Sequence, residues 1–144
     1  MRDILFRGKR CDNGEWVQGF YVRADHHWHK NGIHKDWIAL GASANGGWFA
    51  LHNKYAVKAE TVGQFTGLTD KNGKKIFEGD FIKIPDDYDE FGINAGEIYE
   101  VYFAFGGFRL KPKYSKSKGF WLEDDATVEI IGNIHDNPEL LENH

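Results

Sequence analysis

A chain of 144 residues with a net charge of −4 and a single cysteine excludes several classes of protein. A chain of this length buries about 70% of its unfolded surface, so it needs neither a disulfide nor a metal in order to fold. One cysteine cannot form an internal disulfide, and no apolar run reaches the ~18 residues of a membrane helix or forms a signal peptide at the start. We therefore expect a cytoplasmic protein without a membrane span, and the negative charge disfavours a globally basic nucleic-acid binder.

Glycine steps divide the chain into short, aromatic-rich segments. Aromatic residues make up 15% of the chain, with 17 glycines and only 3 prolines. Such a composition is typical of short strands joined by tight turns. The predicted turns are Asn13-Gly14, Asn31-Gly32, Asn45-Gly46-Gly47, Asn72-Gly73 and Gly106-Gly107. The predicted strands are 3–7, 15–24, 36–40, 48–52, 60–65, 75–78, 81–84, 97–105, 108–111, 119–122 and 127–134.

One short helix is predicted at the C-terminus, in the segment DNPELLENH. Asp136 or Asn137 would cap it, Pro138 suits its first turn, and Leu140 and Leu141 must dock on the body for so short a helix to persist. The predicted fold is therefore all-β with one short C-terminal helix. The meander after residue 78 reads like a small SH3-like barrel, which gives one domain with an N-terminal β-hairpin lobe (1–63) and a barrel lobe (64–144).

Three segments resemble the YopX family, small proteins of phages and prophages. They are MRDILFRG at the start, QFTGLTDKNGKKIFEGDFIKI at residues 64–84, and VEIIGNIHDNPELL near the end. The resemblance implies an all-β protein with an SH3-like barrel in its C-terminal half, a phage or prophage origin and an intracellular setting. It implies no established activity and supplies no catalytic residues.

Within the central segment, Asp70, Glu78 and Asp80 have two interpretations. They are turn residues at turn positions, next to Gly73 and Gly79, which supply unusual backbone conformations. Alternatively, the three carboxylates form a cluster for a hard cation. Their spacing matches no calcium loop, so the turn interpretation is favoured.

The stretch DHHWHKNGIHKDW, residues 25–37, is dense in histidine. With Asn31-Gly32 as a two-residue hairpin loop, His27 would pair with Asp36, and His29 with His34. These four side chains would share one face and converge on a zinc ion. The alternative is a surface hairpin with a polar face, which explains the same residues without a metal and is favoured.

A second candidate site is the basic run at residues 109–118, which contains no acid. Cations would track phosphates while aromatic side chains stack bases, as in a single-strand groove on a small β-barrel. A solvated, lysine-rich edge is the favoured alternative. The candidate nucleic-acid residues are Arg109, Lys111, Lys113, Tyr114, Lys116, Lys118 and Trp121.

Catalytic motifs are missing from the sequence. Cys11 follows Arg7, Lys9 and Arg10, which would lower the pKa of its thiol, but no neighbouring base is indicated. No nucleophile elbow, Walker loop or dinucleotide fingerprint occurs. We therefore expect a non-catalytic module that interacts with an unknown host or phage protein, or with a second copy of itself. The second hypothesis is a nucleic-acid-binding accessory protein of phage replication or regulation, and the third is a metal-dependent enzyme using the histidine cluster.

Overall fold

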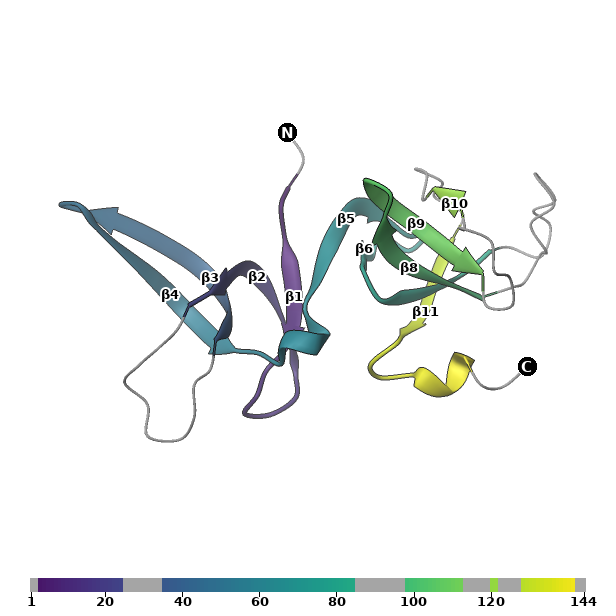
Figure 1. The fold of residues 1–144 in the computed structure, drawn as a ribbon, viewed down its shortest axis with the longest axis horizontal. Coiled ribbons are helices and arrows are strands. Elements are labelled where there is room, and N and C mark those ends of the chain that lie inside the picture. The colour runs from purple at the N-terminus through teal and green to yellow at the C-terminus, as the bar shows by residue number, and fades with distance from the viewer. Residues whose placement is uncertain (1–2, 25–34, 85–97, 113–119, 122–127, 142–144) are drawn as a thin grey trace. The chain divides into compact units, whose positions relative to one another are not determined.

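The computed structural model describes residues 3–24, 35–84, 98–112, 120–121 and 128–141. The chain divides into two compact units, Met1–Phe65 and Thr66–His144 (Figure 1). Each unit is built on antiparallel strands, and the described helical segments are two short 3-10 turns. The all-β prediction is therefore confirmed. No helix in the described parts of the chain is long and apolar enough to cross a membrane.

The first unit is an antiparallel sheet in which most neighbouring strands are also consecutive in sequence. The order across the sheet is β4-β3-β2-β1-β5, and β5 continues into the second unit, where β6 follows it in the sheet order. The 3-10 turn η1 (Ala59–Thr61) leads into β5. The strands are β1 (Phe6–Lys9), β2 (Trp16–Arg23), β3 (Asp36–Asn45), β4 (Trp48–Ala56) and β5 (Gly63–Thr69).

The β3–β4 hairpin is longer than the sequence predicts. Its turn is formed by Gly46 and Gly47, whose φ angles of 57° and 85° are the positive values that tight hairpin turns require. Asn45 pairs with Trp48 directly before and after this turn. The segment 41–45, predicted to interrupt the strands, therefore belongs to β3, because the long partner β4 supplies its pairing.

The second unit contains a five-stranded sheet in the order β10-β9-β8-β7-β11, together with the short strand β6 (Figure 1). Among the described residues no pairing joins β10 to β11, so the sheet as described is open and does not show the predicted barrel closure. The strands are β6 (Lys75–Phe77), β7 (Asp80–Lys83), β8 (Ile98–Ala104), β9 (Gly107–Pro112), β10 (Phe120–Trp121) and β11 (Glu129–Asn133).

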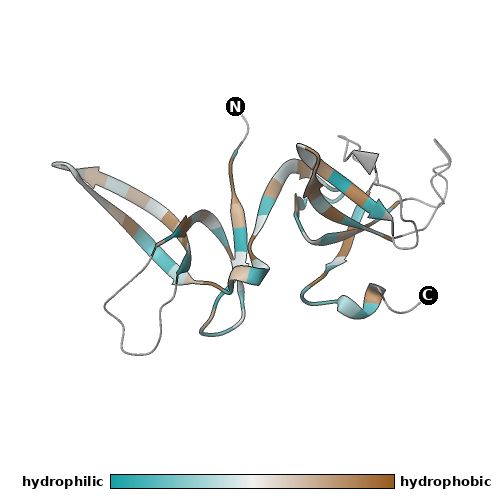
Figure 2. Cartoon of the chain, in the orientation of Figure 1, coloured by the Kyte–Doolittle hydropathy of each residue, from teal (hydrophilic) through white to brown (hydrophobic). Residues whose placement is uncertain are grey.

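Alternation along β8 separates a buried face from a more exposed one. Tyr99 and Val101 are 2% and 1% exposed, whereas Ile98, Glu100 and Tyr102 are only half-buried. Figure 2 shows the matching alternation of hydrophobic and hydrophilic residues along the strands of this sheet. The buried cluster of the unit consists of Ile76, Ile82, Ile84, Tyr99, Val101, Leu110 and Val128.

The predicted C-terminal helix is a single 3-10 turn, η2 (Pro138–Leu141). The two residues expected to cap it both bond to Asn133 at the end of β11: Asn137 accepts a hydrogen bond from its backbone N–H at 3.3 Å, and Asp136 from its side-chain amide at 3.1 Å. Of the two leucines predicted to dock, Leu140 is half-buried, and the side chain of Leu141 lies outside the described side chains. These contacts tie the C-terminal turn to β11.

Candidate interaction surface at the β8–β9 hairpin

The tip of the β8–β9 hairpin is a two-residue turn formed by Phe105 and Gly106. Ala104 pairs with Gly107 on either side of it, and the φ angles of the two central residues are 54° and 83°. The sequence predicted Gly106-Gly107 at the centre, which is wrong by one residue. The observed register places Leu110 opposite Val101, and both are buried in the core. A turn centred on the two glycines would instead place Leu110 opposite Phe103, towards the exposed end of the hairpin.

This tip presents an exposed group of aromatic side chains. Phe103 is 53% exposed and Phe105 is 62% exposed. Phe103 contacts Phe108 edge-to-face, with 5.2 Å between the ring centroids, and the guanidinium of Arg109 lies 5.3 Å from the centroid of the Phe105 ring. Phenylalanine and arginine are both enriched at protein interfaces relative to the rest of a protein surface.

Phe105 adopts a backbone conformation that disfavours its side chain. A bulky residue with positive φ costs about 1 kcal/mol or more, and asparagine or glycine is preferred at this position of a hairpin turn. Strain of this kind, held at an exposed site, points to a role for the side chain outside the fold. Our sequence analysis did not single out Phe105, although an aromatic residue directly before two glycines indicates an aromatic side chain at or beside a hairpin turn.

Further along the hairpin from its tip, one lysine of the predicted basic run lies opposite a glutamate. Lys111 pairs across the strands with Glu100, and although Lys111 lowers the pKa of that carboxyl, burial raises it more. Arg109 contacts Phe105, as described above. The remaining members of the run lie outside the described side chains, so the nucleic-acid site stays a prediction there; they are Lys113, Tyr114, Lys116, Lys118 and Trp121.

The predicted register of the histidine hairpin is wrong at Asp36. Asp36 pairs with Arg23, not with His27, because the ladder continues from the pairs that bury Ile38. The carboxylate of Asp36 accepts a hydrogen bond from the hydroxyl of Tyr21. This hydrogen bond is the main reason why the pKa of Tyr21 is raised, and burial of the hydroxyl raises it further. The other three predicted ligands, His27, His29 and His34, lie outside the described residues, so zinc binding by them stays a prediction. Asp36 does not occupy the position opposite His27 that this prediction gave it.

The buried carboxylates of the second unit hold turns. Asp70 is 3% exposed and accepts hydrogen bonds from the backbone N–H groups of Asn72 and Lys74, both at 2.9 Å. Asp80 is 1% exposed and accepts one from Phe77 at 2.8 Å. Within the described residues no group of three His, Cys, Asp or Glu side chains could hold a metal ion. The favoured turn interpretation therefore accounts for both aspartates.

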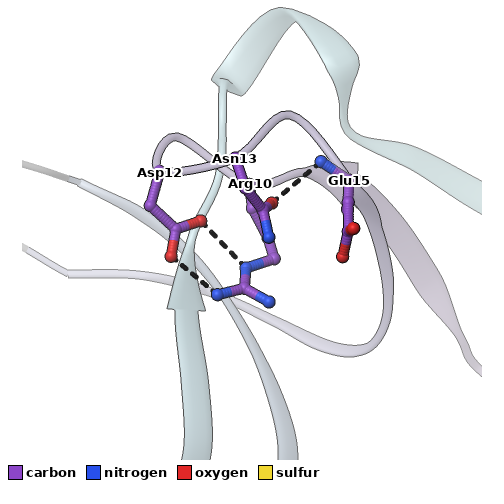
Figure 3. Close-up of polar contacts among 4 residues, drawn as sticks. All are labelled: Arg10, Asp12, Asn13 and Glu15. Atoms are coloured by element: carbon purple, nitrogen blue, oxygen red, sulfur yellow. Dashed lines mark hydrogen bonds and ion pairs between the residues drawn. The ribbon is translucent and has the colours of Figure 1, made fainter.

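Cys11 lies in the β1–β2 loop, next to the ion pair that Figure 3 shows. The Arg10 guanidinium bonds to both carboxylate oxygens of Asp12, at 2.9 and 2.6 Å, and lies 4.1 Å from the Tyr55 ring centroid. Burial of the sulfur raises the pKa of Cys11, and Lys58 lowers it by less. The predicted lowering of this pKa is therefore wrong, because burial outweighs the effect of Lys58, and the carboxylates of Glu60, Asp12 and Asp36 raise the pKa further. The thiol lines a hollow of about 290 Å³ with Asp12, Lys54, Tyr55 and Ala56.

Residues 5–142 match the family model described as YopX protein, and this range covers most of both units and the whole β8–β9 hairpin. The chain belongs to the YopX protein family. A relative in Bacillus subtilis (strain 168), "SPbeta prophage-derived uncharacterized protein YopX", is 35% identical over 75 residues. That match covers 49% of this chain and 52% of the relative, so the chain spans about half the length of this YopX relative.

A crystal structure of protein EF1440 from Enterococcus faecalis has a similar fold. Its superposition on this YopX-family chain gives a TM-score of 0.57 over 98% of this chain and 99% of the other. The two sequences are 22% identical, so the similarity concerns the fold alone.

Proposed function

We propose that this chain is a non-catalytic protein-interaction module of phage or prophage origin that acts in the host cytoplasm. The prophage origin of its Bacillus subtilis relative supports the setting. The observation that carries the interaction is the exposed Phe105, which occupies a turn position with a φ of 54° that asparagine or glycine would fill without strain. The partner is a host or phage protein, or a second copy of this chain.

The hairpin tip suits a partner with an apolar pocket. Fully burying a phenylalanine is worth about 1.5–3 kcal/mol, and Phe103 and Phe105 each leave more than half of their surface available for this. Both rings lie at the end of a paired two-stranded ladder, so little conformational freedom is lost when the tip is bound. The partner's acidic groups would then compete with the Phe105 ring for Arg109.

We also propose that the second unit is an SH3-like barrel. Its strand order supports this topology, because β7, β8, β9 and β10 are neighbours in sequence order and the last strand, β11, returns to pair with the first, β7. The hairpin that carries Phe105 would then be one of the loops of a rigid scaffold, where binding residues are commonly placed.

A photo-crosslinking amino acid in place of Phe105 tests the interaction. We expect one discrete adduct in host cells that carry the phage or prophage, and mass spectrometry of this adduct identifies the partner. The same group in place of Lys75, an exposed residue of β6, is the matched control and should give no such adduct. An adduct of twice the chain's mass would identify a second copy as the partner. Equal labelling from both positions, or none from position 105, would refute a role for the tip.

A further inference from the structure

One face of the sheet in the first unit is basic and aromatic. Pairing across strands places directly opposed residues on the same face. Lys9 pairs with Trp16, and Phe20 pairs with Ala39, which in turn pairs with Lys54. Because alternate residues of a strand share a face, the basic–aromatic face consists of Arg7 and Lys9 (β1), Trp16 and Phe20 (β2), Trp37 (β3), and Lys54 (β4).

The cations of this face are held against its indole rings. The guanidinium carbon of Arg7 lies 4.5 Å from the centroid of the Trp16 ring, and the ammonium of Lys9 lies 5.5 Å from the same centroid. The ammonium of Lys54 lies 5.8 Å from the centroid of the Trp37 ring. Contacts at these distances restrict the side chains and keep their charges close to the sheet surface.

Phe20 lies at the centre of this arrangement. It is 54% exposed, and it pairs across the strands with Ala39, which is fully buried. Lys54 is exposed on the far side of Ala39. Because more than half of its surface is exposed, the Phe20 ring can accept a planar group, and the Lys54 cation lies two strands away on β4.

Acidic side chains do not share this face within the described parts of β1, β2, β3 and β4, since Asp36 belongs to the opposite face with Tyr21.

The net charge also differs between the two units. Residues 1–65 contain nine Lys and Arg against six Asp and Glu, a net +3, whereas residues 66–144 contain nine against sixteen, a net −7. The total of −4 therefore conceals a basic first unit.

From this face we infer a binding site for single-stranded nucleic acid, independent of the hairpin tip. Arg7, Lys9 and Lys54 contact the phosphates, and a base stacks on Phe20, since a positive groove with stacking aromatic side chains is how sequence-tolerant single-strand binders work. Double-stranded nucleic acid would use the cations but conceal its base faces from Phe20. An acidic peptide would likewise use the charges without needing an exposed flat ring.

Fluorescence anisotropy of labelled 20-nucleotide dT and rU oligonucleotides tests the inference with the full chain. We expect binding at 25 mM NaCl that weakens as salt rises, with weaker binding to a duplex of the same length. A plot of log affinity against log salt has a negative slope, and each lost phosphate contact should make that slope shallower by about 0.7. The slope of the Lys9→Gln Lys54→Gln variant should therefore be shallower by about 1.4.

The aromatic part of the site is tested by Phe20→Ala, which should weaken binding at least about fivefold while the salt slope stays unchanged. Two exposed control positions should leave binding within twofold. Leu40→Ala changes an apolar residue that is 49% exposed on the opposite face of the same sheet, and Lys75→Gln removes one charge from the second unit. Thermal melts of all variants establish that each is folded.

Three outcomes would overturn the inference. They are no binding of either oligonucleotide at 25 mM NaCl, tighter binding to the duplex, and affinity that is lost with Lys111→Glu but kept in the face variants. Binding of dT, of rU or of both, with the predicted losses, supports it.

Discussion

The carboxylate of Asp70 accepts a hydrogen bond at 3.1 Å from the backbone N–H of Ile130, a residue 60 positions further along the chain. The same side chain closes the turn between β5 and β6 through the N–H groups of Asn72 and Lys74. One buried carboxylate thus joins a local turn to the last strand of the second unit. A second carboxylate oxygen thus gives aspartate a contact that serine, which could also begin this turn, has no oxygen left to make.

Replacement of Asp70 by alanine should lower the free energy of unfolding by about 3 kcal/mol, because three backbone N–H groups lose a charged acceptor. Asp70→Asn should cost less, since its amide oxygen still accepts one or two of these bonds. Chemical denaturation of the two variants and the wild type measures the difference. Equal stability of all three proteins would show that solvent replaces the carboxylate.

The stability of the wild type should also depend on pH through Asp70. Burial raises the pKa of this carboxyl, but the N–H donors of Ile130, Lys74 and Asn72 together lower it below its ordinary value of 3.8. The folded state therefore binds the proton more weakly than the unfolded chain, so the stabilisation is complete above pH 3.8 and is lost as pH falls through the folded-state pKa. The stability difference between wild type and Asp70→Asn should narrow in that acid range, and a constant difference would contradict this.

Phe105→Asn should leave the free energy of unfolding unchanged or raise it by up to about 1 kcal/mol. Asparagine tolerates the positive φ of this turn, which offsets the lost contact between the ring and Arg109. The same variant should compete poorly with the wild type for the partner. A large loss of stability would show instead that Phe105 is retained for folding, and thermal melts distinguish the two results.

Gly19→Ala should destabilise the first unit by about 1–3 kcal/mol. A Cβ at this position would lie 2.3 Å from the backbone oxygen of Ala39, which cannot move without disrupting the β2–β3 pairing. Gly41→Ala is the matched control in the same sheet, because its Cβ would meet only the Cβ of His52 at 4.0 Å. We expect the control to fold normally, and equal effects at both positions would argue against the described approach of β2 to β3.

Cys11 should react slowly with iodoacetamide at pH 7 although it is exposed. Its pKa is raised from the ordinary 9.0, chiefly by partial desolvation of the sulfur, so little thiolate is present. The reaction rate should rise steeply above pH 9, and Lys58→Gln should slow the reaction further because Lys58 lowers this pKa. A rate at pH 7 above that of a free cysteine peptide would contradict the raised pKa.

The amino-acid sequence by itself determined the all-β class and the approximate positions of the strands, because both follow from local chemistry. An Asn-Gly or Gly-Gly step favours a tight turn through its own backbone angles, as at Gly46 and Gly47. Alternation along β8 likewise places Tyr99 and Val101 on one face of the strand, and the structure buries both. The tight turns also specified that strands such as β3 and β4 are neighbours.

Tertiary structure alone decided the registers and the long-range pairs. The turn at Phe105-Gly106 follows from burying Leu110 opposite Val101, and Asp36 faces Arg23 because the ladder is set by the buried Ile38. These choices minimise exposed apolar surface over several strands at once, so no short window of sequence contains them. The basic–aromatic face depends on the same registers: residues from four strands share it only because each ladder is paired as it is.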